Sequence, residues 1–295
     1  MLLFEVIAEM KKLRLAACLL FFAVACHPSF CRADALRFAP LPMASDAIIK
    51  QQFQFFSTFL SEQLDQDVEQ LSYQSYQTLI SDLLADKIDL AHLGPLPYLL
   101  LSRQDPTFVP LVRFVDARGA DSYTCSLVSF QHKFDLQQLS DETSIALTQP
   151  YSTCGYLMTE HLLQQQGKTL QQFPYYFAGN HSEAVLEVVR GNAVLAGVKT
   201  SVAEQYRHLG VHIEEQDIAL PGHLLVANAR TLSPSQIELI RRELLTLDPR
   251  HNLEHRKLTS TWGQEFRYGA IPVATDDYQF IEDLLAVIAI PGVGK

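Results

Sequence analysis

After residue 35, short runs of apolar residues alternate with segments in which the apolar residues recur at the spacing of one helix face. From Ile49 to Leu60 the apolar side chains recur at intervals of three and four, which predicts one buried face of a helix. A second helix with the same spacing is predicted after Tyr73. The strands predicted in this region are 36–41, 68–71 and 88–93. Strands that alternate with helices indicate an α/β fold with a mainly parallel sheet.

The same alternation returns in the second half of the chain and indicates another α/β unit at about 120–215. A helix is predicted over 233–247, with Pro234 in its first turn. The last helix is predicted over 278–288, after the capping pair Asp276 and Asp277. The predicted strands of this half are 108–115, 123–130, 144–147, 173–177 and 193–198, with extended segments at 218–227 and 267–273.

Three loops follow the first three predicted strands, at 42–45, 72–76 and 94–98. Ligands of parallel α/β sheets collect at the carboxyl ends of the strands. We therefore expect the three loops to converge. Ser45, Tyr76 and Pro95 are the candidate binding residues that they contribute.

The stretch 149–156 joins a predicted buried strand to a helix through small hydroxyl residues. The first turn of a helix presents free N–H groups at the positive end of the helix dipole, which favours anions. Ser152, Thr153, Cys154 and Gly155 are therefore candidate anion-binding residues. The simpler alternative is that Ser152 or Thr153 serves only as the cap of the helix.

Composition and charge narrow the class of ligand. Of the 295 residues, 48% are apolar and 19% are charged, a balance typical of folded proteins. The formal net charge of −10 argues against nucleic acid or an anionic membrane as the main partner. It does not exclude a small anion, because local dipoles and hydroxyl groups determine such a site.

The first 35 residues resemble a secretory signal peptide. Lys11, Lys12 and Arg14 precede an apolar run over 15–25, and small residues follow up to Ala35. The run is shorter than the roughly 20 apolar residues that a transmembrane helix needs. Export to the periplasm is therefore expected, and a lipoprotein anchor at Cys26 is the less favoured alternative.

Two of the five cysteines, Cys125 and Cys154, follow the predicted leader. In an oxidising compartment they can pair, but a free buried cysteine is the simpler expectation, so both alternatives stay open. No spacing of cysteine and histidine indicates a zinc site, and we expect neither a metal nor another cofactor.

Six stretches in register resemble the phosphate/phosphonate-type substrate-binding proteins of ABC importers. Residues 87–98, KIDLAHLGPLPY, are similar to the family sequence VDLAWLGPLPY, and residues 149–157, QPYSTCGYL, are similar to DPNSTSGYL. The other four stretches are the early helix with 73–84, then 178–184, 218–222 and 269–278. The resemblance covers nearly the whole chain after the leader.

The resemblance implies a two-lobed periplasmic-binding-protein fold, with a mainly parallel sheet and flanking helices in each lobe. Two crossings near 116–121 and 218–222 would form the hinge, and ligand binding would close the lobes. The implied division is a signal peptide at 1–35, the first part of lobe 1 at 36–117, lobe 2 at 118–217, and a return to lobe 1 at 218–295.

The resemblance also implies roles for single residues. The hydroxyl run that holds the phosphonate oxygens in the family corresponds to Ser152, Thr153 and Cys154, and two further ligand contacts correspond to Tyr76 and His181. Two carboxylates that bind an aminoalkyl group in some members are replaced here by Ser201 and His223. Lys199 is interpreted as a surface charge, with a binding role as the alternative. A simpler oxyanion, such as phosphate, phosphite or a small phosphonate, or a ligand with a second negative end, is therefore expected.

Three functions remain open. The first is a monomeric solute-binding protein that delivers an oxyanion to the permease of an ABC importer. The second is a ligand sensor for a separate membrane receptor. The third, and least favoured, is a secreted hydrolase that uses Cys154 or Ser152 as nucleophile and His181 as base.

Overall fold

A six-stranded sheet carries both the early and the late parts of the chain. The computed structural model describes residues 34–131, 135–216 and 218–293, so the predicted signal peptide lies outside the described residues except for its last two positions. Residues 35–295 form one compact unit. The strand order in the sheet is β13-β4-β12-β3-β1-β2. Its strands are β1 (Leu36–Pro40), β2 (Val68–Gln70), β3 (Leu90–Leu93), β4 (Phe108–Phe114), β12 (Leu224–Asn228) and β13 (Ala270–Ile271).

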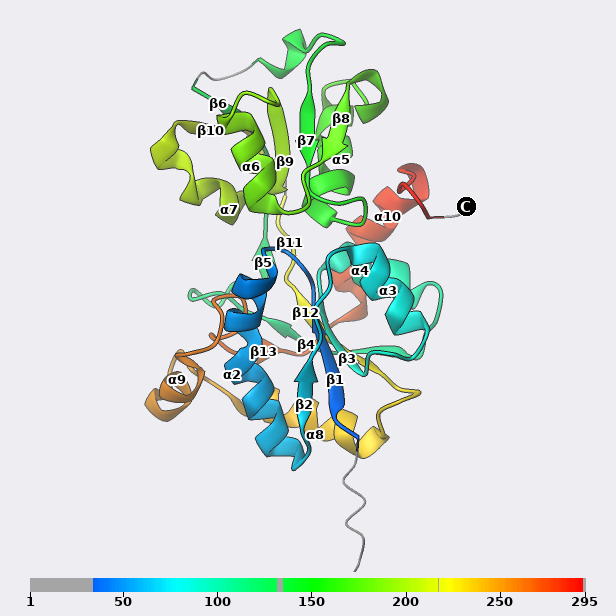
Figure 1. Cartoon of the computed structure of the whole chain (residues 1–295), viewed down its shortest axis with the longest axis vertical. Helices are drawn as coiled ribbons and strands as arrows, with labels where there is room; N and C mark the ends of the chain where they lie inside the picture. Colours follow the sequence, from blue (N-terminus) through cyan, green and yellow to red (C-terminus); the bar gives the residue numbers. More distant parts are fainter. Residues whose placement is uncertain (1–33, 132–134, 217, 294–295) are drawn as a thin grey trace, which may run out of the picture. The chain divides into compact units, whose positions relative to one another are not determined.

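A five-stranded sheet is built entirely from the middle of the chain, in the order β10-β6-β9-β7-β8. β5 (Ser122–Tyr123) follows β4 in the chain, and β11 (Leu220–Pro221) precedes β12. The two strands pair as a short antiparallel ribbon (Figure 1). This ribbon joins the outgoing and the returning chain. The strands of the middle sheet are β6 (Cys125–Phe130), β7 (Ile145–Leu147), β8 (Tyr175–Phe177), β9 (Leu195–Lys199) and β10 (Val211–Gln216).

Helices cover both faces of each sheet (Figure 1). Those associated with the first sheet are α2 (Asp46–Leu64), α3 (Tyr76–Leu84), α4 (Pro95–Ser102), α8 (Pro234–Thr246), α9 (Leu253–Thr259) and α10 (Gln279–Val287). Those of the second are a π-helical turn (Thr153–Met158) that runs into α5 (Thr159–Gln165), then α6 (His181–Val189) and α7 (Thr200–Gln205). Short 3₁₀ turns lie at Leu136–Gln138, Leu170–Gln172, Arg207–Leu209 and Thr275–Tyr278.

The alternation of side chains along the strands divides the core of the second sheet between its two faces. Ile145 and Leu147 belong to the apolar cluster that contains Leu157 of the π-helical turn. Ala146, which lies between them, belongs instead to the cluster that contains Val185 of α6. Successive strand residues point to opposite faces, so both faces must be apolar. This explains why the sequence shows continuous apolar runs here.

The predicted α/β fold with helix-flanked sheets is confirmed, and each sheet also contains antiparallel strand pairs. β1 runs parallel to β2 and β3, whereas β12 pairs antiparallel with both β3 and β4. In the second sheet β7 is parallel to β8 and β9, and β6 is antiparallel to β9 and β10. Both sheets are therefore mixed. An apolar run does not reveal strand direction, and the returning strand β12 enters the first sheet with reversed direction.

Several short elements were not predicted from the sequence, namely α7, α9 and β10. Ser45 is the N-cap of α2, and Asn180 caps α6 by accepting a hydrogen bond from the Glu183 amide. None of the helices in the described ranges is long and apolar enough to cross a membrane.

Candidate functional site

The three loops that were predicted to converge do so at a small closed cavity. Its volume open to the centre of a water molecule is about 10 Å³. That is room for about one water molecule. The cavity is lined by Leu41, Met43, Tyr76, Gly94, Pro97, Tyr123, Ser152, Thr153, Cys154, His181, Lys199 and His223. It therefore takes residues from the first sheet, from the second sheet and from the ribbon that connects them.

Gln149 holds the converging loops together from the end of β7. Its side-chain oxygen accepts a hydrogen bond from the Tyr76 amide at 2.8 Å, and its nitrogen donates to the Gly179 carbonyl at 2.7 Å. A weaker contact at 3.5 Å reaches the Pro42 carbonyl. One buried amide side chain thus connects loops that follow strands of both sheets.

Ser152 caps the helix start, as the simpler interpretation predicted. Its hydroxyl oxygen accepts a hydrogen bond from the Gly155 amide at 3.0 Å. The amides of Thr153 and Cys154, the first two helical residues, have no acceptor among the described residues, as helix geometry requires. The Ser152 hydroxyl proton remains available to a further acceptor. The cap and an anion-binding role are therefore compatible.

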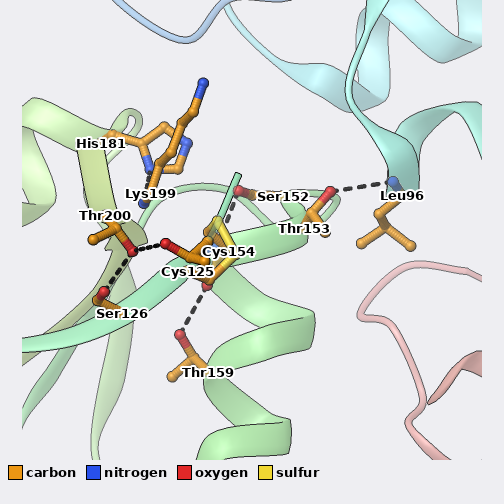
Figure 2. The surroundings of a disulfide bond; sticks show 12 residues. Leu96, Cys125, Ser126, Ser152, Thr153, Cys154, Thr159, His181, Lys199 and Thr200 are labelled. Carbon is orange, nitrogen blue, oxygen red and sulfur yellow. Dashed lines mark hydrogen bonds between the residues drawn. A yellow bond between two sulfur atoms is a disulfide. The ribbon is translucent and has the colours of Figure 1, made fainter. Parts of the chain in front are cut away.

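Thr153 links the two sides of the cavity. Its hydroxyl oxygen accepts a hydrogen bond from the Leu96 amide in the first turn of α4, at 3.1 Å (Figure 2). Leu96 belongs to the part of the chain with the first sheet, whereas Thr153 follows β7 of the second. The contact therefore fastens the cavity shut in this structure.

Cys154 forms a disulfide with Cys125 of β6 (Figure 2). Of the two alternatives that the sequence left open, the structure has the paired one. A disulfide sulfur carries no proton, so the Cys154 side chain offers no donor in place of the third hydroxyl of the family. The donor that remains at Cys154 is its backbone amide.

Gly155 is required by packing rather than by contact with the cavity. A Cβ atom at this position would lie 1.9 Å from the Thr148 hydroxyl oxygen, so the helix start approaches the end of β7 closely only with glycine there. Gly155 does not line the cavity. Neither do Ser45, which is exposed at the start of α2, and Pro95, which is buried at the start of α4. The neighbours Met43, Gly94 and Pro97 line it instead.

His181 is the first residue of α6 and is buried beside the cavity. Its Nδ1 accepts a hydrogen bond from the Lys199 amide at 3.1 Å, which leaves the proton on Nε2 (Figure 2). Burial, with the nearby charge of Lys199, lowers the pKa of His181 to about 3. The imidazole is therefore neutral at physiological pH, with one N–H donor.

Lys199 is the only lysine or arginine among the lining residues, and no aspartate or glutamate is among them. Its side chain is about 10% exposed, so the interpretation as a surface charge is wrong. The ammonium lies 2.7 Å from the Glu265 carboxylate and 5.1 Å from the centre of the Tyr123 ring. Burial opposes ionisation of Glu265, but the Lys199 charge outweighs it and lowers the pKa of that carboxyl.

A wider groove adjoins the cavity on the side of this ion pair. Its volume is about 840 Å³, and it shares Tyr123, Lys199 and His223 with the cavity. Ser201 lines the groove, whereas His223 lines both spaces. The Lys199–Glu265 pair therefore lies where the closed cavity meets the groove.

Two further histidines, His92 and the lining residue His223, are buried with ring nitrogens that lack hydrogen-bond partners. Both nitrogens of His92 and Nδ1 of His223 lack hydrogen-bond partners, and the two ring centres lie 5.1 Å apart. Burial lowers the pKa of His92 to about 4. Burial and the Lys199 charge also lower the pKa of His223 well below its usual value. Both rings are neutral at physiological pH.

These depressed pKa values predict a loss of stability in mild acid. The unfolded chain protonates histidine near pH 6.5, whereas folded His92 takes a proton only near pH 4, so the unfolded state binds more protons between these values. Stability should therefore fall as the pH is lowered through this window. Urea unfolding measures the free energy of unfolding at pH 7.5 and at pH 4.5. The decrease in this free energy between the two pH values should be smaller in His92→Leu than in the parent, by roughly 2–3 kcal/mol. An unchanged difference would contradict a buried neutral His92.

Among the candidate residues, the cavity brings together Tyr76, Ser152, Thr153, Cys154 and His181. Sequence reasoning missed Tyr123 and Glu265, and it did not assign His223 to the site. The signal for Tyr123 and His223 was present, because both adjoin the two chain crossings. No comparable signal marked Glu265, which lies in an irregular segment between α9 and β13. Among the described residues no cluster of three histidine, cysteine, aspartate or glutamate side chains could hold a metal ion.

Comparison with known proteins identifies the family. The family model described as "ABC transporter, phosphonate, periplasmic substrate-binding protein" matches residues 38–278. A probable ABC transporter phosphite-binding protein, PhnD1, of Prochlorococcus marinus is 24% identical over 60% of this chain and 62% of its own length. The phosphate-import protein PhnD of Mycolicibacterium smegmatis is 22% identical over 60% of this chain and 61% of its own. The chain thus matches about three fifths of each relative.

Solved structures show the same fold at low sequence identity. The structure of Prochlorococcus marinus PhnD1 in complex with methylphosphonate has a TM-score of 0.73 at 18% identity, and covers 85% of this chain and 97% of that one. A binding protein component of an ABC phosphonate transporter from Pseudomonas aeruginosa also has a TM-score of 0.73, and covers 85% of both chains. Because the family model matches far more than half of the residues, the chain belongs to the periplasmic substrate-binding proteins of phosphonate ABC transporters.

Proposed function

We propose that this protein is an exported solute-binding protein that captures a small oxyanion and delivers it to the permease of an ABC importer. One observation carries the proposal. Unpaired helix amides, the Lys199 ammonium and the neutral His181 N–H all border one cavity that no carboxylate lines. Amides, hydroxyls and a single cation are suited to the oxygens of a tetrahedral anion. As in its family, the protein would act in the periplasm, here as a monomer.

Binding and release would require the two sides of the cavity to separate. A tetrahedral oxyanion is larger than the single water molecule that the cavity admits. We therefore propose two lobes, 36–117 with 218–295 and 118–217, that rotate about the crossings near 116–121 and 218–222. Three contacts support the assignment of this structure to a closed form, namely Leu96–Thr153, Tyr76–Gln149 and Lys199–Glu265.

The cavity favours phosphate, phosphite or a small phosphonate over a ligand with an amine. The two relatives are named for phosphite and phosphate, and the solved PhnD1 complex contains methylphosphonate. The Glu265 carboxylate is bonded to Lys199, so its charge is already balanced by that lysine. An ammonium group would therefore have to displace Lys199 to find a partner.

The contacts of Cys154, Ser152 and His181 argue against the hydrolase alternative. Cys154 has no thiol because it is paired with Cys125, and the Ser152 hydroxyl accepts from the Gly155 amide. Nδ1 of His181 is occupied by the Lys199 amide, so no carboxylate orients the ring as a base. A sensor would use the same binding site, and a test for transport separates it from an importer component.

Thr153→Val tests the binding site. The parent protein should gain roughly 2.7 kcal/mol of stability from its ligand at 100 times the dissociation constant, whereas the variant should lose most of that gain. Thermal unfolding with phosphate, phosphite, methylphosphonate, sulfate and small carboxylates measures this, each protein being compared with its own ligand-free state.

A matched control for this test is Thr58→Val, which removes an exposed hydroxyl that bonds only the Gln54 carbonyl. It should behave as the parent. The unliganded Thr153→Val protein should itself be less stable, by about 1–3 kcal/mol, because the buried Leu96 amide loses its acceptor. A full ligand-induced shift in Thr153→Val would show that the oxygens are held elsewhere.

A further inference from the structure

A second concave site lies away from the cavity, between α9 and the segment before β13. Its volume is about 450 Å³, and three arginines line it, Arg250, Arg256 and Arg267, together with Tyr268. Pockets of several hundred Å³ are typical of small-molecule sites. The three cations gather here on a chain whose formal net charge is −10.

The three arginines differ from all the other arginines that the structure describes. Each of the nine others forms an ion pair with an aspartate or glutamate. Arg250, Arg256 and Arg267 form none with any described residue. Asp248 lies near enough to Arg250 to interact electrostatically, but its carboxylate is bonded to the His251 ring at 2.9 Å. No aspartate or glutamate is among the residues that line the pocket, so the three guanidinium groups share it without an ion-pair partner inside it.

Contacts within the protein hold these side chains in place. Arg256 donates to the carbonyls of Pro249 and Arg250, at 2.9 and 2.6 Å. The Arg250 guanidinium lies against Gly119, where an added Cβ atom would come within 1.9 Å of its Nη1. Such contacts reduce the entropy that a ligand must overcome in ordering long side chains.

Arg267 adds an unused donor to the pocket. Its guanidinium lies 5.4 Å from the centre of the Tyr268 ring, and its Nη1 makes only a long contact of 3.4 Å with the Ser260 carbonyl. Its Nε is buried without a hydrogen-bond partner. A buried guanidinium N–H normally has an acceptor, so Arg267 makes fewer hydrogen bonds within the described chain than is usual for a buried arginine.

We propose that this arginine pocket is a second anion site, which takes a small ligand with two or more phosphate or carboxylate groups. Guanidinium groups bind both oxyanions in a bidentate manner. A single tetrahedral ion would engage only part of a pocket of this volume, whereas three cations match a ligand of several negative charges. The site adjoins the wider groove through Ala117 and Tyr268, so it is connected with the closed cavity but shares no residue with it.

The test is calorimetric titration of the protein with pyrophosphate and, separately, with citrate at low ionic strength. The parent should bind at least one of them at a single site with a dissociation constant below about 1 mM. Arg250→Gln should weaken that binding about tenfold, and a combined Arg256→Gln and Arg267→Gln variant should weaken it more. The ligand that binds more tightly identifies the class of oxyanion.

Two control variants distinguish binding at the arginine pocket from binding in the cavity and from a general effect of charge. Arg242→Gln removes an exposed arginine that is paired with Glu243, and Lys199→Met changes the cavity; both should bind the probe as the parent does. Arg250→Gln breaks no hydrogen bond in the described chain, so it keeps the test valid if the double variant folds poorly. The proposal is overturned if neither probe binds, if Arg242→Gln weakens binding equally, or if Lys199→Met abolishes binding that the arginine variants retain.

Discussion

Lys199→Met should weaken oxyanion binding by about 10- to 100-fold, because it removes the only cation that lines the cavity. The loss should exceed that of a simple hydrogen bond, since Glu265 would then face the bound anion without its partner at 2.7 Å. Glu265→Gln should have the opposite effect and strengthen binding, because it frees the ammonium and removes a negative charge. Calorimetric titration with the preferred oxyanion measures both changes.

The matched control is Lys87→Met, which removes an exposed lysine paired with Asp82 at 2.9 Å on α3. Its affinity should equal that of the parent. The pair of cavity variants also separates two roles of the ion pair. If Lys199→Met and Glu265→Gln both weakened binding to the same extent, the pair would serve only to hold the two sides of the cavity together, and Lys199 would not be the cation that meets the ligand.

Breaking the Cys125–Cys154 disulfide should lower the free energy of unfolding by about 3–4 kcal/mol, the value expected for a closed loop of 29 residues. The bond ties β6 to the second residue of the helix start, so oxyanion binding should also weaken. The predicted leader carries the other three cysteines, so the protein is prepared without it. Urea unfolding with and without dithiothreitol then measures the loss in the free energy of unfolding.

The variant with both Cys125→Ala and Cys154→Ala serves as the control for this experiment. It should match the reduced parent in stability and should not respond to dithiothreitol. A reduced parent that loses less than about 1 kcal/mol would contradict the structural role of the disulfide.

The order of strands and helices could be predicted from the sequence because apolar runs and helix spacing report burial directly. Strand direction could not be predicted, since β12 has the same apolar pattern whether it runs parallel or antiparallel to β3. The short helix α9 was also missed. It has one buried residue, Thr259, and exposed Leu253 and Leu258, so it lacks the apolar face on which such a prediction depends.

The helix start at Ser152 could be predicted as part of the site because small hydroxyl residues between a strand and a helix have a local physical meaning. The charged residues at the cavity could not be predicted in this way. Lys199 lies at the end of β9 and Glu265 is 66 residues later in an irregular segment, so only the tertiary fold reveals that they form a pair. The same is true of Thr153, whose hydroxyl meets an amide 57 residues earlier in the chain.

The central claim is that the amides at Thr153 and Cys154, with Lys199 and His181, capture a negatively charged oxygen between two lobes. A crystal structure of the protein with its preferred oxyanion tests this most directly. The account predicts the anion at hydrogen-bond distance from those two amides, with the Lys199 ammonium turned toward it. An anion bound only elsewhere, with residues 152–154 unchanged and remote from it, would contradict the account.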